Sequence, residues 1–370
     1  MNHLLVPQNI DPVISEVISA IHYRPAVSLI MPLAAQISLS AEISHQLKIK
    51  ADKVKTELEN AYPAELCNVV LDKLHTLLTD LRLPSDRKGL AIFVSPIFQK
   101  MVYLRNAVQE RIVIDESFEI RDLVADEQEA VHCLLLTLNG TNAQLFLVEA
   151  DVIKPIDEVA PFSIDEVTGD TPQRVANFSD PKQRKQLLAD KFLYHVDKQL
   201  DQVLTRYAVP LMVLTTEKLA GHYKKLTRHS DLIIGYATGY QEHATLTDCR
   251  RLIQPQLNEW KLQLENQLLD RVSAAADAHI LITGIEQIWK ACHAYKSGSL
   301  VVERNFRFEA KHGASPEVIE SSDGQEKHLF TIKDAVDDLI ETVIKNHGKV
   351  AFTADDSLLR YGRMALISDY

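Results

Sequence analysis

The sequence has few cysteines, no long hydrophobic run and no excess of positive charge. Its four cysteines, Cys67, Cys133, Cys249 and Cys292, are widely spaced and form no CxxC pair, so we expect reduced, buried thiols. The longest apolar run, 131–138, is too short to cross a bilayer. The first residues lack a basic start followed by an apolar core. We therefore expect a cytoplasmic protein with no membrane partner.

The charge balance limits the choice of partner. The 370 residues include 40 lysines and arginines against 51 aspartates and glutamates, a net charge of −11. A chain of this charge is not attracted as a whole to phosphate groups. Contact with RNA therefore requires a local basic patch; otherwise the partner is a protein. There is no GxxxxGK or GxGxxG motif, so we expect no nucleotide cofactor.

The order of helical and strand patterns predicts an α/β protein of three α/β domains, over residues 1–126, 127–277 and 278–370. In the first domain the patterns predict helices over 13–21 and 41–61 and from Pro63, and strands over 26–33, 89–95, 100–104 and 112–114. In the second they predict strands over 132–139 and 143–149 joined at Asn139-Gly140, a loop over 151–170, and then helices over 180–207, 216–226 and 256–272 with strands over 210–215 and 231–237.

The last domain has the clearest pattern. Apolar residues at helical spacing fall over 284–294 and 334–346, and short strands are expected over 299–303, 349–353 and 364–368. Asn346-His347-Gly348 is a helix stop, because glycine adopts the left-handed conformation of a C-cap. These elements predict a small α-β-α sandwich. The polar stretch 311–327 is expected to be a flexible loop.

The C-terminal stretch 336–370 and the block 284–308 carry a resemblance to a known family. They resemble the third domain of the archaeo-eukaryotic class I release factor and Pelota superfamily. In that superfamily, the third domain has the fold of kink-turn-binding ribosomal proteins. A bacterial branch, the bacterial archaeo-eukaryotic release-factor-like proteins, has the same order of elements and an aromatic-containing turn, here 303–307. The resemblance implies that the middle domain, 127–277, is ribonuclease-H-like.

The resemblance also shows what this chain lacks. The superfamily hydrolyses peptidyl-tRNA through a Gly-Gly-Gln motif placed before the long helix of the middle domain. The corresponding loop, 167–185, contains Gly169, Gln173, Arg174 and Gln183 but no such motif, as in Pelota. The first domain has no Asn-Ile-Lys-Ser sequence, so codon reading is not expected. The first strand of the middle domain has no carboxylate for metal-dependent nuclease chemistry, and the scattered histidines fit no zinc pattern. No metal is expected.

Two short basic segments are candidates for contact with RNA or the ribosome. The first has no acidic residue and combines cations with aromatic rings that are able to stack on bases; its candidates are Lys218, His222, Tyr223, Lys224, Lys225 and Arg228. The second consists of Arg304 and Arg307 beside two phenylalanines. An ordinary solvated helix face and a strand edge with outward arginines explain the same patterns without any RNA.

These observations favour a non-enzymatic, release-factor-like protein that associates with the ribosome or structured RNA, in ribosome rescue or stress-linked modulation of translation. One alternative is an ester or phosphodiester hydrolase that uses the loop 167–185. Another is a protein-interaction module whose last domain docks a translational GTPase or another translation partner. Oligomeric state is not indicated by the sequence.

Overall fold

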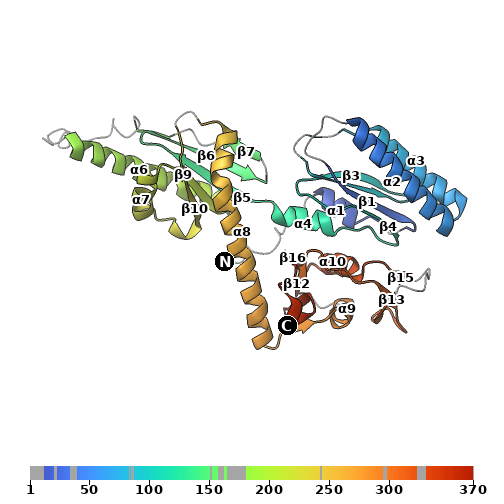
Figure 1. The fold of residues 1–370 in the computed structure, drawn as a ribbon. Coiled ribbons are helices and arrows are strands. Elements are labelled where there is room, and N and C mark those ends of the chain that lie inside the picture. Colours follow the sequence, from blue (N-terminus) through green and yellow to red (C-terminus); the bar gives the residue numbers. More distant parts are fainter. Residues whose placement is uncertain are drawn as a thin grey trace. The chain divides into compact units, whose positions relative to one another are not determined.

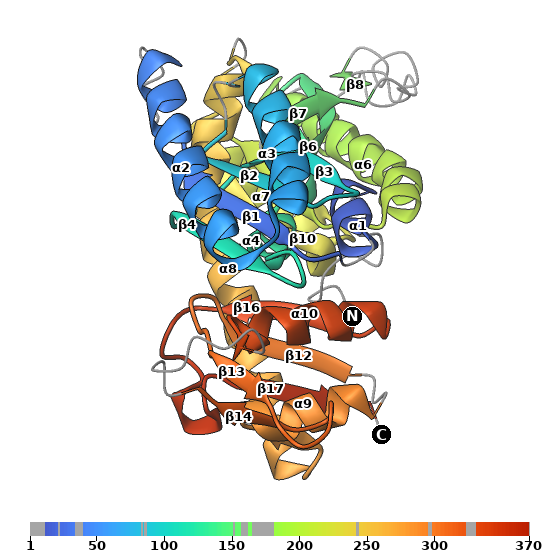
Figure 2. The same cartoon turned by 90° about the vertical axis from the view of Figure 1, so that its right-hand side faces the viewer.

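The computed structural model describes residues 12–20, 23–33, 40–82, 84, 87–150, 152–156, 162–164, 181–241, 244–294, 298–322 and 331–369. These residues form two compact units, one of 1–129 with 268–370 and one of 130–267. Figures 1 and 2 show their elements. The first, second and third predicted domains each contain a separate main sheet, while their boundaries after 126 and 277 stay predictions. In the described part of the chain, no helix is long and apolar enough to cross a membrane.

The N-terminal part of the first unit is an antiparallel sheet of four strands in the order β3-β2-β1-β4. The strands are β1 (Ala26–Pro32), β2 (Gly89–Val94), β3 (Gln99–Leu104) and β4 (Arg111–Asp115). The helices α2 (Ser40–Ala61) and α3 (Ala64–Thr79) pack on one face, and α1 (Pro12–Ile18) and α4 (Arg121–Glu129) on the other. The α4 helix was not predicted. The β3 strand lies at the edge of this sheet, as Figure 1 shows.

The C-terminal part of the first unit is the predicted α-β-α sandwich. Its strands are β11 (Leu281–Thr283), β17 (Met364–Ser368), β12 (Gly298–Glu303) and β16 (Lys349–Thr353), in that order across the sheet. Only β12 and β16 pair in parallel. The helices α9 (Ile285–His293) and α10 (Ala335–Lys345) cover one face. The end of α8 (Leu246–Asp277) covers the other through Leu268 and Val272. The third domain therefore has the predicted architecture.

A second, small sheet corrects the prediction of a flexible loop over 311–327. It consists of β13 (Ala310–His312), β14 (Ile319–Ser321) and β15 (Thr331–Ile332). Ile319 is 3% exposed, and the indole nitrogen of Trp289 donates a hydrogen bond of 2.9 Å to the carbonyl of Pro316. This apolar anchor fixes the segment against α9. Residues 323–330 of the predicted loop lie outside the described residues.

The two parts of the first unit share one hydrophobic core. Apolar side chains from the segment 118–124 and from α10 belong to the same buried cluster. Polar bonds reinforce the contact, because the buried carboxylate of Asp337 accepts hydrogen bonds from the main-chain N–H groups of Ile120 at 3.0 Å and Arg121 at 2.8 Å. The segments 1–129 and 268–370 thus fold together although the second unit separates them in the sequence.

The second unit has the predicted ribonuclease-H-like topology. Its sheet has the order β10-β9-β5-β6-β7, built from β5 (His132–Leu138), β6 (Asn142–Glu149), β7 (Val152–Pro155), β9 (Leu211–Thr215) and β10 (Ile233–Thr238). The β6 strand alone is antiparallel to the other four. Two short strands, β7 and β8 (Phe162–Ser163), lie in the stretch 151–170 that was predicted to be loop. They extend the β5–β6 hairpin.

Helices cover both faces of this sheet. The helices α6 (Pro181–Tyr207) and α7 (Glu217–Leu226) pack on one face, and the first half of α8 packs on the other. Along α6 the fully buried side chains include Phe192, Val196 and Leu200, spaced four residues apart as an amphipathic helix requires. This packing brings α6 and α7 together and positions the candidate surface described next.

Candidate nucleic-acid interface

The α7 helix presents its lysines to solvent. Lys218, Lys224 and Lys225 are all exposed, while Tyr223 is fully buried. Because residues three, four and seven apart share a helix face, Lys218, His222 and Lys225 form one stripe. Lys224 is also exposed but lies outside this row of residues on the helix. The helix therefore offers a short cationic stripe, which we call the α7 stripe, defined by Lys218, His222 and Lys225.

The ring of Tyr223 is part of the core and does not stack on a ligand. Its hydroxyl donates a hydrogen bond of 3.2 Å to Oδ1 of Asp197, a fully buried carboxylate on α6. Burial raises the pKa of Tyr223 above its ordinary value, so the hydroxyl keeps its proton and stays a donor. The stacking role expected for this tyrosine is therefore wrong in this structure.

The carboxylate of Asp197 accepts hydrogen bonds from the end of α7 and from the turn that follows it. Its carboxylate accepts hydrogen bonds from the Thr227 hydroxyl at 2.6 Å and from Nε of Arg228 at 3.2 Å. Burial opposes the ionisation of Asp197, but the bonds from Thr227 and Arg228 outweigh it and lower its pKa. The charged carboxylate thus joins α6 to α7, as buried ionised groups do when their hydrogen bonds are complete.

Arg228 is held in place but remains accessible. Its Nη2 lies 3.1 Å from Oδ2 of Asp201, and its side chain is 52% exposed. The guanidinium carbon lies 5.9 Å from the ring centroid of Tyr194 on α6, and Tyr194 is 56% exposed. Tyr194 is thus an exposed aromatic ring beside a cation, the arrangement that stacks on a nucleic-acid base. Its position on the polar face of the amphipathic helix α6 is the one signal for Tyr194 that is visible in the sequence.

His222 pairs with a carboxylate near the beginning of α6. Its Nε2 contacts Oδ1 of Asp190, and the same nitrogen lies 3.5 Å from Nε2 of Gln186. The side chains of His222 and Asp190 are 34% and 41% exposed. An imidazole that a carboxylate orients is able to act as a general base toward a substrate. This pair is therefore the strongest arrangement for acid–base chemistry on the α6–α7 surface.

Arg304 and Arg307 belong to the first unit, where they form ion pairs in the turn after β12. Arg304 pairs with Glu129 at the end of α4. The Nη1 atom of Arg307 lies 3.8 Å from Asp334 and 3.9 Å from Glu119. Their side chains are 27% and 30% exposed. These contacts link the two parts of the first unit, and their role in RNA binding stays a prediction.

The loop that corresponds to the Gly-Gly-Gln position falls largely outside the described residues. Gly169, Gln173 and Arg174 are among those not described, and Gln183 belongs to the first turn of α6. Within the ranges that the structure describes, no group of three or more histidine, cysteine, aspartate or glutamate side chains is arranged to hold a metal ion.

A comparison with protein families matches residues 132–296 to bacterial archaeo-eukaryotic release factor family 3. This match confirms the resemblance inferred from the sequence. It covers the ribonuclease-H-like unit and continues through α8, β11 and α9, whereas most of the C-terminal residues that first suggested the resemblance lie beyond it. The α6–α7 surface thus lies within the segment that carries the family pattern. No curated protein matches the chain.

Solved structures of translation factors are also similar to this chain. The crystal structure of the archaeal translation termination factor aRF1 is 11% identical, with a TM-score of 0.26 over 96% of this chain and 97% of that one. The crystal structure of Archaeoglobus fulgidus Pelota is 12% identical, with a TM-score of 0.38 over 76% of this chain and 79% of that one. In a model of ribosome-bound archaeal Pelota and ABCE1, the matched chain is 10% identical, with a TM-score of 0.41 over 99% of this chain and 95% of that one. The family match carries the resemblance.

Proposed function

We propose that this chain is a release-factor-like protein that associates with the ribosome or structured RNA without cleaving peptidyl-tRNA. The family match over 132–296 is the observation that carries the proposal. The absence of a Gly-Gly-Gln sequence from the chain supports the non-enzymatic part. A role in ribosome rescue or stress-linked modulation of translation, and a cytoplasmic location, are the finer parts of the same proposal.

The α6–α7 surface supplies the contact chemistry. The lysines of the α7 stripe are exposed, and Arg228 with Tyr194 adds a cation beside an open aromatic ring. Lysine and arginine neutralise phosphates and an aromatic ring stacks on an unpaired base. Because Asp190, Asp197 and Asp201 lie along the same side of α6, the patch is narrow. It fits a short stretch of backbone with one or two open bases.

Sedimentation with ribosomes tests the proposal. We expect the chain to pellet with ribosomes at low salt and the double variant Lys218→Glu/Lys225→Glu to remain in the supernatant. The matched control is Lys48→Glu/Lys53→Glu, which changes the same charge at exposed positions of α2. With a labelled single-stranded RNA, the α7 variant is expected to reduce the slope of log affinity against log salt by about 0.7 for each lysine, about 1.4 for both. Failure of the unaltered chain to pellet at any salt concentration contradicts the proposal.

The same experiment separates the protein-interaction alternative. If the chain pellets with ribosomes and the Lys218→Glu/Lys225→Glu variant pellets equally well, the contact is made elsewhere. Docking of a translational GTPase or another protein through the C-terminal domain then becomes the favoured explanation. Such binding is expected to show little dependence on salt, because it does not release counterions from a nucleic acid.

The Asp190–His222 pair keeps a hydrolase as the second candidate. An ester or phosphodiester hydrolase requires a base. Two histidines on this surface contact a carboxylate, His222 with Asp190 and His229 with Asp201, and His222 is the more exposed of the two. Purified protein incubated with a peptidyl-tRNA analogue and with RNA tests this. If activity is present, His222→Gln is expected to lower it about 100-fold or more, with Lys53→Gln at an exposed position of α2 as the control. Loss of activity in Gln173→Ala or Gln183→Ala assigns the loop to the same reaction.

A further inference from the structure

Two lysines of α6 flank the exposed ring of Tyr194. Lys191, Tyr194 and Lys198 are three, four and seven residues apart, so they share one face of the helix. The ring of Tyr194 is 56% exposed, Lys198 is exposed and Lys191 is half-buried. We call these two lysines the α6 row. Neither was predicted from the sequence as a contact residue, because the lysines of α6 alternate with aspartates along the chain.

The α6 row lies on the side of Tyr194 away from α7. Figure 1 shows α7 beside α6, and the flank of α6 that faces it carries the aspartates that bond to α7 and the turn after it, Asp190, Asp197 and Asp201. Lys191 and Lys198 each follow one of these aspartates directly, which places them about 100° further round the helix. The α7 stripe, with Lys218 and Lys225, lies on the other side. Tyr194 is therefore flanked by lysines on both sides.

The lysines of this surface have no carboxylate partner in the part of the chain that the structure describes. No side-chain hydrogen bond or ion pair there involves Lys191, Lys198, Lys218, Lys224 or Lys225. The aspartates of α6 are already bonded to His222 or Arg228, so the charge of Arg228 is balanced and adds little. Glu217 is the remaining carboxylate of the two helices. Unpaired lysines thus outnumber unpaired carboxylates around Tyr194.

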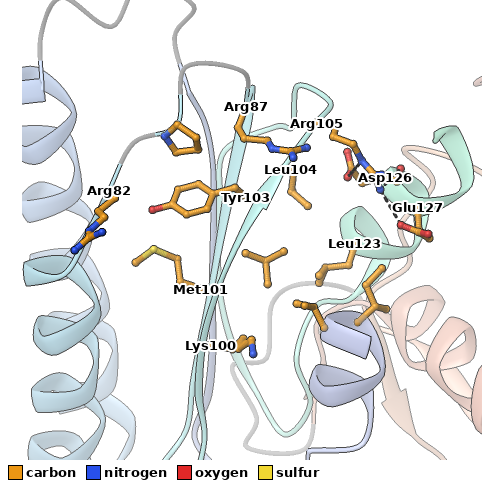
Figure 3. Close-up of a pocket in the computed structure, with 14 residues that line it drawn as sticks. Arg82, Arg87, Lys100, Met101, Tyr103, Leu104, Arg105, Leu123, Asp126 and Glu127 are labelled. Atoms are coloured by element: carbon orange, nitrogen blue, oxygen red, sulfur yellow. Dashed lines mark hydrogen bonds and ion pairs between the residues drawn. The ribbon is translucent and has the colours of Figure 1, made fainter. Parts of the chain in front are cut away.

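The cations of a cavity in the first unit are paired instead. This cavity, of about 660 Å³, lies beside β3, and Lys100 and Arg105 are among its lining residues. Arg105 lies 2.8 Å from Asp126 and 2.8 Å from Glu127, as Figure 3 shows, and Lys100 pairs with Glu16. These charges balance locally. The unpaired lysines of the α6–α7 surface are therefore the better candidates for contact with an anionic ligand.

We propose that the α6–α7 surface binds a single-stranded segment of RNA, with one unpaired base stacked on Tyr194 and the neighbouring phosphates held by the α6 row and the α7 stripe. This inference rests on the proposed function and names the kind of RNA that the surface takes. An aromatic ring stacks on a base whose face is open. A duplex covers those faces, so it meets the lysines and leaves Tyr194 without a partner. An acidic peptide meets the lysines but has no base to stack.

Three labelled RNA probes test this inference. They are a single strand of about ten nucleotides, the duplex of that strand with its complement, and an abasic strand of the same length, which keeps the phosphates and lacks the bases. The full chain is titrated against each and followed by fluorescence anisotropy. We expect the single strand to bind at least about tenfold more tightly than the other two. The test is strict, because the duplex has the higher charge density and is favoured by charge alone.

Two variants locate the binding site. Lys191→Gln/Lys198→Gln is expected to weaken binding of the single strand by about tenfold and to reduce the slope of log affinity against log salt by about 1.4, and Lys191→Arg/Lys198→Arg is expected to restore both. Tyr194→Ala is expected to abolish the difference between the normal and the abasic strand. The control is Lys48→Gln/Lys53→Gln at exposed positions of α2, which is expected to bind normally. Circular dichroism checks that each variant is folded.

Several outcomes overturn the inference. These are equal or tighter binding of the duplex, equal binding of the normal and abasic strands, and unchanged affinity in Lys191→Gln/Lys198→Gln. Polyglutamate that displaces the strand as effectively as unlabelled single strand assigns the surface to an acidic protein. A chain that pellets with ribosomes and fails these tests keeps the proposed function and loses this inference, whereas a chain that neither pellets nor binds loses both.

Discussion

Arg121 and Asp334 form a fully buried ion pair in the core of the first unit. Nη2 of Arg121 donates to Oδ2 of Asp334 at 2.7 Å, and the two side chains are 2% and 3% exposed. The Nη1 atom of Arg121 also donates to the carbonyl of Phe306. Asp334 in turn caps α10 by accepting from the N–H of Val336 at 3.1 Å. One arginine thus joins α4, the turn after β12 and the beginning of α10.

Removal of this arginine is expected to destabilise the first unit strongly. Arg121→Met removes the hydrogen-bonded counter-ion of the buried Asp334 carboxylate and leaves Arg307, 3.8 Å away, as the nearest cation; the expected cost is about 3 kcal/mol of unfolding free energy. Asp334→Asn is expected to lower the unfolding free energy less when it is added to Arg121→Met than when it is made in the wild-type protein, because the two residues interact directly. Urea unfolding measures both effects. The control is Lys311→Met, whose partner Glu320 is 3.6 Å away at the surface, with an expected loss of at most about 1 kcal/mol. Equal losses in Arg121→Met and Lys311→Met contradict this account.

Glu119 is expected to make the unfolding free energy fall as pH rises. Burial, followed by the charges of Asp337 and Asp334, raises the pKa of Glu119 to about 10 from an ordinary value of 4.5. Its Oε2 atom has no hydrogen-bond partner among the described residues. Between these two values the folded state keeps a proton that the unfolded state releases, so stability decreases with pH.

The Glu119→Gln variant isolates this effect. Glutamine resembles the protonated carboxyl and does not titrate. The variant therefore lacks the proton that the wild-type protein releases at this position when it unfolds. The slope of unfolding free energy against pH between pH 5 and 9 is expected to become less negative by up to about 1.4 kcal/mol per pH unit. Urea unfolding at several pH values measures it. Parallel curves for the two proteins show that Glu119 is ionised in the folded state.

How far the sequence predicts this fold depends on where the deciding interactions lie. Helices and strands with a strong apolar period were found within a few residues, including α3, α10 and every strand of the ribonuclease-H-like sheet except β7 and the short β8. The α4 helix was missed because it is mostly polar and its Arg121 and Asp122 are buried only by virtue of distant partners. The sequence predicted this helix only from Gln256, whereas α8 begins at Leu246 and continues through Pro255, although a proline inside a helix removes one main-chain hydrogen bond.

The candidate surface shows the same limit. The sequence located the cations of α7, because a run without acidic residues is visible locally. It assigned Tyr223 to solvent because Asp197, the acceptor of its hydroxyl, lies 26 residues earlier in the chain. The exposure of Tyr194 and its contact with Arg228 depend on how α6 and α7 pack. Pairings of this kind are set by tertiary structure and leave no local pattern.

All four cysteine thiols are expected to be unreactive in the folded protein. Each is at most 2% exposed, and burial raises the pKa of Cys133 and Cys292 to about 12. Since the thiolate is the reactive form, a thiol reagent such as DTNB is expected to label none of them in buffer and all four in denaturant. Rapid labelling of one thiol in buffer identifies a region that opens locally.

Tyr194 and Tyr223 provide a matched test of the α6–α7 surface. Tyr194 is 56% exposed and Tyr223 fully buried, so their substitution is expected to separate binding from stability. Tyr194→Ala removes the stacking ring and is expected to weaken binding of a labelled single-stranded RNA by about tenfold, at unchanged unfolding free energy.

Tyr223→Phe is expected to do the reverse. It removes the hydrogen bond to Asp197, lowers the unfolding free energy by about 1 kcal/mol and leaves RNA affinity unchanged. Fluorescence anisotropy and urea unfolding measure the two quantities on the same preparations. If Tyr223→Phe weakens RNA binding while Tyr194→Ala does not, the base contact is made by a conformation in which α7 moves away from α6, and Asp197 no longer holds Tyr223 in the core.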